Sequence, residues 1–268
     1  MFNLTPAVRN LLLANIAFYL LQVNLRLDPS ITQLGSLYPL GSPYFHFWQF
    51  FSYMFLHDPL SWSHLIFNMF GLISFGPLLE QRWGGQRFIA FWLMCGVGAG
   101  VLYEGTRAYD RYQMEQAATE FHRLPSGADF NNFFSKFFPE AEGYQQLAAA
   151  LDRNPTNAEY LEAANKSIDA ALVDSLNAPG GGMLGASGAL FGLLFAFAYL
   201  FPNTELFLLF FPFPIKAKYF VLGYGLLELY QGVHRAPGDH VAHFAHIGGL
   251  LIGFVIIKFW EGGRTRFY

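Results

Sequence analysis

Residues 185–201 read GASGALFGLLFAFAYLF, an apolar run with a single serine, Ser187, near its start. A run of this composition predicts a helix that crosses a bilayer, whose hydrocarbon core is about 30 Å thick. A second apolar run later in the chain begins with Ala245-His246. Polar and ionisable side chains inside a membrane are costly and usually mark a functional site. Because a serine and a histidine can form a nucleophile and its base, the pair predicts a hydrolytic site built within a bilayer.

The composition is typical of a membrane protein. The chain is 53% hydrophobic, 19% aromatic and only 13% charged, whereas a soluble domain carries about 25% charged residues. Residues 107–174 hold 11 acids and 6 bases, and the rest of the chain holds 8 acids and 10 bases, so the net charge of −3 averages two different regions. This balance does not predict nucleic-acid binding. The single Cys95 excludes an internal disulfide and a cysteine metal cluster, and we expect no metal and no other cofactor.

Six apolar stretches are long enough, or nearly so, to span a membrane. They predict an all-α polytopic membrane protein with six transmembrane helices, and no small-residue cleavage site follows the first of them. The expected spans are Val8–Val23, Ser63–Leu79, Phe88–Tyr103, Gly185–Phe201, Ile215–Gln231 and His243–Trp260.

Lysine and arginine gather on one side of this topology, which sets its orientation. The two outer loops that are shorter than the insert hold only Arg26 and Arg235. We therefore expect both termini in the cytoplasm, an active site that opens to the outer face, and a bacterial inner membrane as the location. The bases on the inner side are Arg9, Arg82, Arg87, Lys216, Lys218, Lys258, Arg264 and Arg266.

The chain divides into four expected parts: 1–105 with the first three spans, a polar helical insert at 106–182, 183–260 with the last three spans, and a cytoplasmic tail at 261–268. Within the insert we expect one helix over 106–123 and another that starts at a capping box from Thr156 to Glu159 and reaches Leu176. Phenylalanines at 130, 133, 134, 137 and 138 supply apolar mass for a core or for a lipid interface. This acidic extramembrane module could recruit a partner protein.

Four polar side chains should lie at similar depth if the topology is right. Ser187 and His246 fall in the first turns of their spans, and His64 and Asn68 fall in the first two turns of theirs. A helix rises 1.5 Å per residue, so all four lie within about 10 Å of the outer boundary. Each residue alone also has a purely structural explanation. A serine among small residues commonly packs two helices together, and His64 with Asn68 could hydrogen-bond a neighbouring helix. A six-helix transporter would instead carry polar residues through the inner halves of its spans, which are almost purely apolar here.

Three motifs together give a resemblance to a known family. They are Gly185-Ala186-Ser187-Gly188, then AHxxGxxxG over 245–253, and HxxxN from His64 to Asn68; Glu80 and Gly84 also fit. In this order and on these spans, they make the chain resemble the rhomboid intramembrane serine proteases. The resemblance covers all six spans and fails only over the insert.

The resemblance implies a rhomboid bundle that cleaves transmembrane protein substrates within or near their membrane segments, among membrane lipids. Ser187 would be the nucleophile, His246 its base without a required acid, and His64 and Asn68 the oxyanion donors. The supporting residues would be Gly185, Gly188, Phe191, Gly249 and Gly253, with the glycines bringing two helices close together. The alternative is a catalytically inactive rhomboid-like protein that binds membrane helices.

The chain departs from the family pattern at two positions. Phe191 stands where the family often has a tyrosine against the histidine ring, and Gln49 follows Trp48 where it often has arginine. Glu228 is an intramembrane acid with no role in the pattern, which we expect near a water-accessible gap or the interface. His240 and His243 are expected at the interface, and their spacing with His246 does not favour a zinc site.

Overall fold

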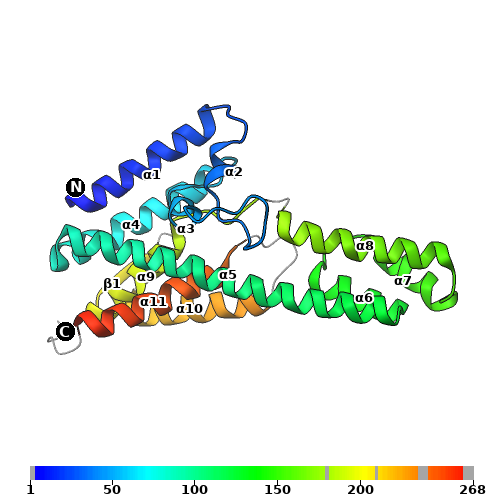
Figure 1. Ribbon diagram of the computed structural model, residues 1–268. Coiled ribbons are helices and arrows are strands. Elements are labelled where there is room, and N and C mark those ends of the chain that lie inside the picture. Colours follow the sequence, from blue (N-terminus) through cyan, green and yellow to red (C-terminus); the bar gives the residue numbers. More distant parts are fainter. Residues whose placement is uncertain (1–3, 179–180, 209–210, 235–240, 262–268) are drawn as a thin grey trace.

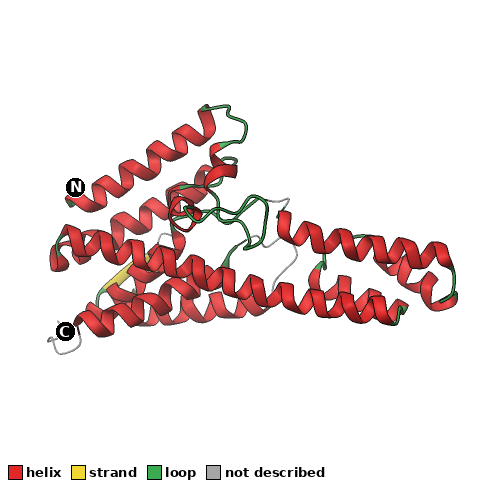
Figure 2. Cartoon of the chain, in the orientation of Figure 1, coloured by secondary structure: helices red, strands yellow, loops and turns green. Residues whose placement is uncertain are grey.

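The computed structural model describes residues 4–178, 181–208, 211–234 and 241–261, and its helices form two regions (Figure 1). A bundle contains α1, α4, the first part of α5, α9, α10 and α11, and a helical module, residues 106–178, extends away from it. Figure 2 shows that almost everything else is loop. The helices are α1 (Pro6–Asn24), α2 (Ile31–Gly35), α3 (Gln49–Ser52), η1 (Tyr53–Phe55, a 3-10 turn), α4 (Trp62–Trp83), α5 (Gly85–Arg123), α6 (Gly127–Phe137), α7 (Tyr144–Arg153), α8 (Ala158–Asn177), α9 (Ser187–Leu200), α10 (Ala217–Val233) and α11 (His243–Glu261).

The bundle helices identify a multi-pass membrane protein. Four of them, α1, α4, α5 and α11, are long and apolar enough to cross a bilayer, while α9 is apolar but has only 14 residues. The helix α10 has 17 residues and carries Glu228. The six-span count therefore stays a prediction, with four spans supported by length and composition.

Three details differ from the sequence expectation. The separate helix expected over 106–123 is instead the second half of α5, which contains no proline and runs unbroken for 39 residues through Gly105. A short antiparallel hairpin of β1 (Glu205–Leu208) and β2 (Phe211–Lys216) precedes α10, so the chain is not purely helical and the fifth apolar helix begins at Ala217 rather than Ile215. Residues 262–268 of the expected tail, Arg235 and His240 lie outside the described residues, whereas Glu261 is the last residue of α11.

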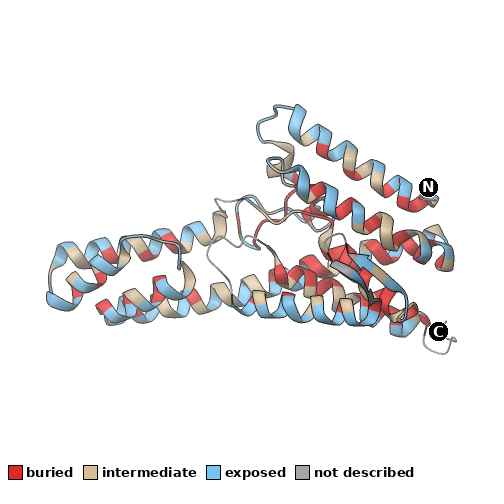
Figure 3. Ribbon diagram, turned by 180° about the vertical axis from the view of Figure 1, so that it is seen from behind, coloured by how far each residue is buried: buried red, intermediate tan, exposed pale blue. Residues whose placement is uncertain are grey.

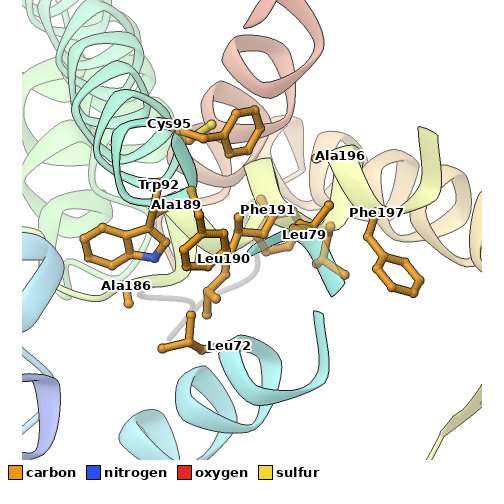
Figure 4. Packing of buried hydrophobic residues seen from close by; sticks show 14 of the residues in the cluster. Leu72, Leu79, Trp92, Cys95, Ala186, Ala189, Leu190, Phe191, Ala196 and Phe197 are labelled. Carbon is orange, nitrogen blue, oxygen red and sulfur yellow. The ribbon is translucent and has the colours of Figure 1, made fainter. Parts of the chain in front are cut away.

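The helix α9 lies at the centre of the bundle core. All but three of its 14 residues are buried, which explains how so short and uniformly apolar a helix is stable there. Figure 4 shows that Leu190 and Phe191 of α9 lie in the same apolar cluster as Leu72 of α4 and Trp92 of α5. The buried residues of the chain concentrate on these central helices when the molecule is viewed from behind (Figure 3).

The module has a separate apolar core. Met114 and Phe121 of α5 pack with Phe130 and Phe133 of α6 and with residues of α7 and α8. The α8 cap is Asn157, whose side chain accepts from the N–H groups of residues 159 and 160, one position later than the expected capping box. Four helices thus bury a common face away from the bundle.

The segment before α9 is held by the long loop between α1 and α4. Leu37 and Met183 exchange both backbone hydrogen bonds, at 2.8 and 2.9 Å. The N–H of Gly185 donates to the carbonyl of Tyr53 at 2.9 Å. Because these bonds fix the backbone on both sides of residue 184, the start of α9 has a defined place against the loop.

Candidate active site

Ser187 and His246 meet at one end of the bundle. Ser187 is the first residue of α9, and its Oγ lies 2.7 Å from Nε2 of His246, in the first turn of α11. The His246 ring stacks on Phe191, with ring centroids 4.2 Å apart and planes 10° from parallel. His246 is buried and Ser187 is partly exposed, so the hydroxyl is the accessible member of the pair.

Glycines bring the two helices that carry this pair into backbone contact. A Cβ on Gly249 would lie 1.9 Å from the carbonyl oxygen of Gly188, and one on Gly253 would lie 3.0 Å from Gly192. A Cβ on Gly188 itself would lie 2.7 Å from Ala99 of α5. A side chain at Gly249 or Gly253 would push α9 and α11 apart, and one at Gly188 would push α9 away from α5, so these glycines allow the serine and histidine to reach hydrogen-bond distance.

His64 approaches the same point from α4. A Cβ on Gly185 would lie 2.9 Å from Nε2 of His64 and 3.7 Å from Oγ of Ser187, so the imidazole fits over a glycine whose φ of +130° also disfavours other residues. The N–H of Asp58 donates to Nδ1 of His64 at 3.2 Å. A neutral ring whose Nδ1 accepts carries its proton on Nε2, on the side that faces Gly185.

Asn68 is buried one turn further along α4. Its Nδ2 donates to the carbonyl of His64 at 2.7 Å, inside its own helix, and its Oδ1 has no partner among the described residues. The amide nitrogen carries a second hydrogen that this bond does not use. Asn68 therefore lies one helical turn from His64, with one of its two amide hydrogens committed to α4.

The glutamine at residue 49 is fully hydrogen-bonded to the loop. Gln49 is buried; its Oε1 accepts from the N–H groups of Tyr38 and His46, and its Nε2 donates to the carbonyls of Leu34 and Tyr44. Nearby, the Tyr53 hydroxyl donates to the Gly96 carbonyl at 2.7 Å, and burial raises the pKa of this phenol. A neutral glutamine thus joins several turns of this loop.

Glu228, which has no role in the family pattern, contacts the histidine of the candidate site. It lies on α10, is 3% exposed, and its Oε2 is 2.8 Å from Nδ1 of His246 and 2.7 Å from Nδ1 of His243. His243 is also buried, so the two side chains contact each other inside the protein. The signal was present, since a carboxylate in an apolar helix needs partners, but sequence alone does not show which helices are neighbours.

Glu80 has a structural place. Its carboxylate accepts from the N–H groups of Ala7 and Val8 at 2.8 and 2.9 Å and from the hydroxyl of Thr5. These are the unpaired donors at the start of α1, where the helix dipole favours a negative charge. The acid therefore joins α4 to α1, away from the serine and histidine.

The comparisons with known proteins identify the fold family. The rhomboid domain model matches residues 44–114 and 164–260, which is more than half of the chain, and the interruption falls in the module. An uncharacterized rhomboid protein, mitochondrial, of Schizosaccharomyces pombe is 29% identical over 211 residues, 78% of this chain and 49% of that protein. The chain thus spans about half the length of this relative. On the family match, the chain belongs to the rhomboid family.

Proposed function

We propose that the chain is an intramembrane serine endopeptidase that cleaves membrane proteins within or beside their transmembrane segments. The observation that carries the proposal is the 2.7 Å contact between Oγ of Ser187 and Nε2 of His246, at one end of an apolar bundle. A nucleophile within hydrogen-bond reach of a base is the arrangement that covalent catalysis requires. Membership of the family is consistent with this activity and equally with an inactive relative.

In the proposed reaction, the Ser187 oxygen attacks the carbonyl carbon of the scissile peptide bond while Nε2 of His246 takes the hydroxyl proton. The tetrahedral intermediate collapses when the same nitrogen gives that proton to the leaving amine, which leaves an ester on Ser187. A water molecule then repeats the sequence, releasing the acid and restoring the hydroxyl. No step needs a cofactor.

The negative charge on the substrate oxygen would be stabilised by donors around the start of α9. The N–H of Ser187 lies in the first turn, where backbone donors have no partner within the helix. Nε2 of His64 lies next to Gly185, and Asn68 offers its remaining amide hydrogen. Preorganised donors of this kind are usually the largest catalytic contribution in acyl transfer.

Orientation and compartment also belong to the proposal. The asymmetry of lysine and arginine favours the site on the face opposite to the termini. The relative described as mitochondrial gives no support to the expected bacterial inner membrane. In either membrane, the substrates would be transmembrane proteins that reach the bundle through lipid.

Labelling with a fluorophosphonate probe in detergent tests the proposal, because the probe reacts only with an activated serine. We expect wild-type protein and Ser63→Ala, a substitution of an exposed serine on α4, to be labelled and Ser187→Ala to be unlabelled. A folded wild-type protein without labelling, and without cleavage of a rhomboid-type model substrate, would instead favour the inactive, helix-binding alternative.

A further inference from the structure

One buried carboxylate contacts two histidines behind the proposed nucleophile and base. Oε2 of Glu228 lies 2.8 Å from Nδ1 of His246 and 2.7 Å from Nδ1 of His243, and all three side chains are buried. A carboxylate in an apolar bundle is stable only if its oxygens are hydrogen-bonded. Both histidines come from the first turn of α11, so α10 and α11 together build this contact.

The contact fixes which nitrogen of His246 carries a proton. An ionised carboxylate can only accept, so Nδ1 of His246 must be the donor. In the neutral ring, Nε2 then has a free lone pair, and this is the nitrogen 2.7 Å from Oγ of Ser187. The opposite tautomer would place a proton between the two reacting atoms and leave no base.

A metal ion explains the cluster less well than these hydrogen bonds. The three donor atoms lie within 4.8 Å of one another, and two histidines with one glutamate are a known zinc ligand set. However, two nitrogen or oxygen ligands of one tetrahedral zinc ion lie about 3.3 Å apart, given zinc–ligand bonds of about 2.0 Å. The separations of 2.7 and 2.8 Å between Oε2 of Glu228 and the two Nδ1 atoms are hydrogen-bond lengths. They are too short for the oxygen and a nitrogen to be ligands of one zinc ion.

We propose that Glu228 is the positioning residue of His246, so that the site works as a triad, and that His243 holds the carboxylate in place. This inference rests on the proposed function. When Nε2 of His246 takes the proton of Ser187, the ring becomes a cation whose Nδ1–H still donates to Glu228. No proton passes to the carboxylate. Its charge stabilises the imidazolium that forms during attack, and its geometry keeps the ring aimed at the serine.

The decisive variant is Glu228→Gln, because it has nearly the same size and removes the charge, and because its amide can either accept from or donate to Nδ1, so that the tautomer of His246 is no longer fixed. We expect kcat for cleavage to fall on the order of 10²-fold, within the 10²- to 10⁴-fold range typical of general acid–base contributions, while KM stays within about twofold. Glu228→Ala should lose more. The control is Glu104→Gln, another buried acid, which accepts from the N–H of Leu40 away from the serine; its kcat should match wild type.

A purely structural role predicts the opposite pattern, with Glu228→Gln equal to wild type in kcat and altered only in thermal stability; that result would overturn the inference. If the glutamine variant does not fold, Glu228→Asp replaces it and must be labelled by fluorophosphonate at least tenfold faster than Glu228→Ala. Equal rates for these two would also overturn it. Failure of wild-type labelling contradicts the proposed function itself, so the two failures are distinguishable.

Discussion

The bundle and the module are built in opposite ways. Large hydrophobic side chains such as Phe67 and Phe259 are exposed on the bundle, and no buried polar or charged residue among those described lies in the module. A soluble domain buries apolar residues and exposes charge, whereas a lipid-facing bundle exposes apolar residues and keeps its polar groups inside. The buried polar residues are Asn15, Ser36, Ser42, Gln49, His57, Asn68, Glu80, Glu104, Glu228, His243, His246 and Glu261.

The difference between the two interiors shows which region of the chain can hold reactive groups. In the module, a core of phenylalanine, alanine and leucine stabilises a shape and leaves nothing reactive inside. In the bundle, most of these buried polar residues are hydrogen-bonded through their side chains, and the bonds hold the loop, the start of α1 and the proposed active site. The comparison therefore predicts that substitutions in the bundle change reactivity and that equivalent ones in the module change local stability.

The largest effect should come from removing either half of the nucleophile–base pair. Ser187→Ala and His246→Ala should each abolish cleavage of a rhomboid-type model substrate without preventing folding. Residues that act as a unit lose nearly everything singly, so the double variant should be no slower than either single one. Turnover assays on purified variants check this, and substantial activity of Ser187→Ala would remove the proposed mechanism.

The next largest effect compares the same clash in the two regions. A Cβ on Gly249 would lie 1.9 Å from the carbonyl oxygen of Gly188, and a Cβ on Gly127 would lie 2.1 Å from that of Ala148 in the module. Both alanine variants should be destabilised, by about 1–3 kcal/mol as for other overpacked sites. Only Gly249→Ala should also lose fluorophosphonate labelling, because it separates α9 from α11.

Gly223→Ala is the control for this pair, since a Cβ there meets no atom within 4 Å. Thermal unfolding and labelling rate are measured on all three variants. If Gly127→Ala slowed labelling as much as Gly249→Ala, the two regions would be mechanically coupled and the comparison would fail.

A smaller loss is expected at the oxyanion donors. Asn68→Ala and His64→Ala should each lower turnover on the order of 10²-fold or less, since other donors remain. KM should change little, because these groups act on charge that develops during attack. If both variants turned over substrate at the wild-type rate, His64 and Asn68 would only pack helices and would not stabilise the oxyanion.

Much of the bundle could be predicted from the sequence because lipid imposes strong rules. Runs of apolar residues locate the spans, and the resemblance of three motifs to a known family predicted that Ser187 pairs with His246. The partners of Glu228 and Gln49 could not be predicted, since they depend on which helices and turns lie side by side. The unbroken α5 was missed because the change from apolar to polar composition at about residue 104 resembles the end of a helix.

A pH effect should be confined to the bundle loop. His57 is fully buried outside the spanning helices, and burial, together with the nearby His64, lowers its pKa from 6.5 to about 3. Between these values the unfolded chain binds a proton that the folded chain does not. Stability is therefore lost as the pH falls from 6.5 towards 3, with a slope of up to about 1.4 kcal/mol per pH unit.

His57→Phe keeps an aromatic ring and cannot titrate, so its stability should depend less on pH over this window. Unfolding of both proteins in detergent at pH 7.5 and pH 5 gives the comparison. Equal pH dependence in the two proteins would show that His57 is protonated in the folded state.

The smallest effect on Ser187 is expected from removing the module altogether. Its core is separate from that of the bundle, and the ends of the removed segment both leave the bundle near the contact between Arg107 and the Ser175 carbonyl. Loop-closure entropy rises only slowly with length, so a short Gly/Ser linker in place of residues 107–178 should close the gap at little cost. Ser187 should then be labelled by fluorophosphonate within about threefold of the wild-type rate, because Leu37, Met183 and Tyr53 still hold the start of α9.

Cleavage of natural substrates should fall further than labelling if the acidic surface of the module recruits them. Comparing the cleavage rates of model and natural substrates measures this difference. Loss of labelling in a well-folded deletion variant would show instead that the module shapes the active site.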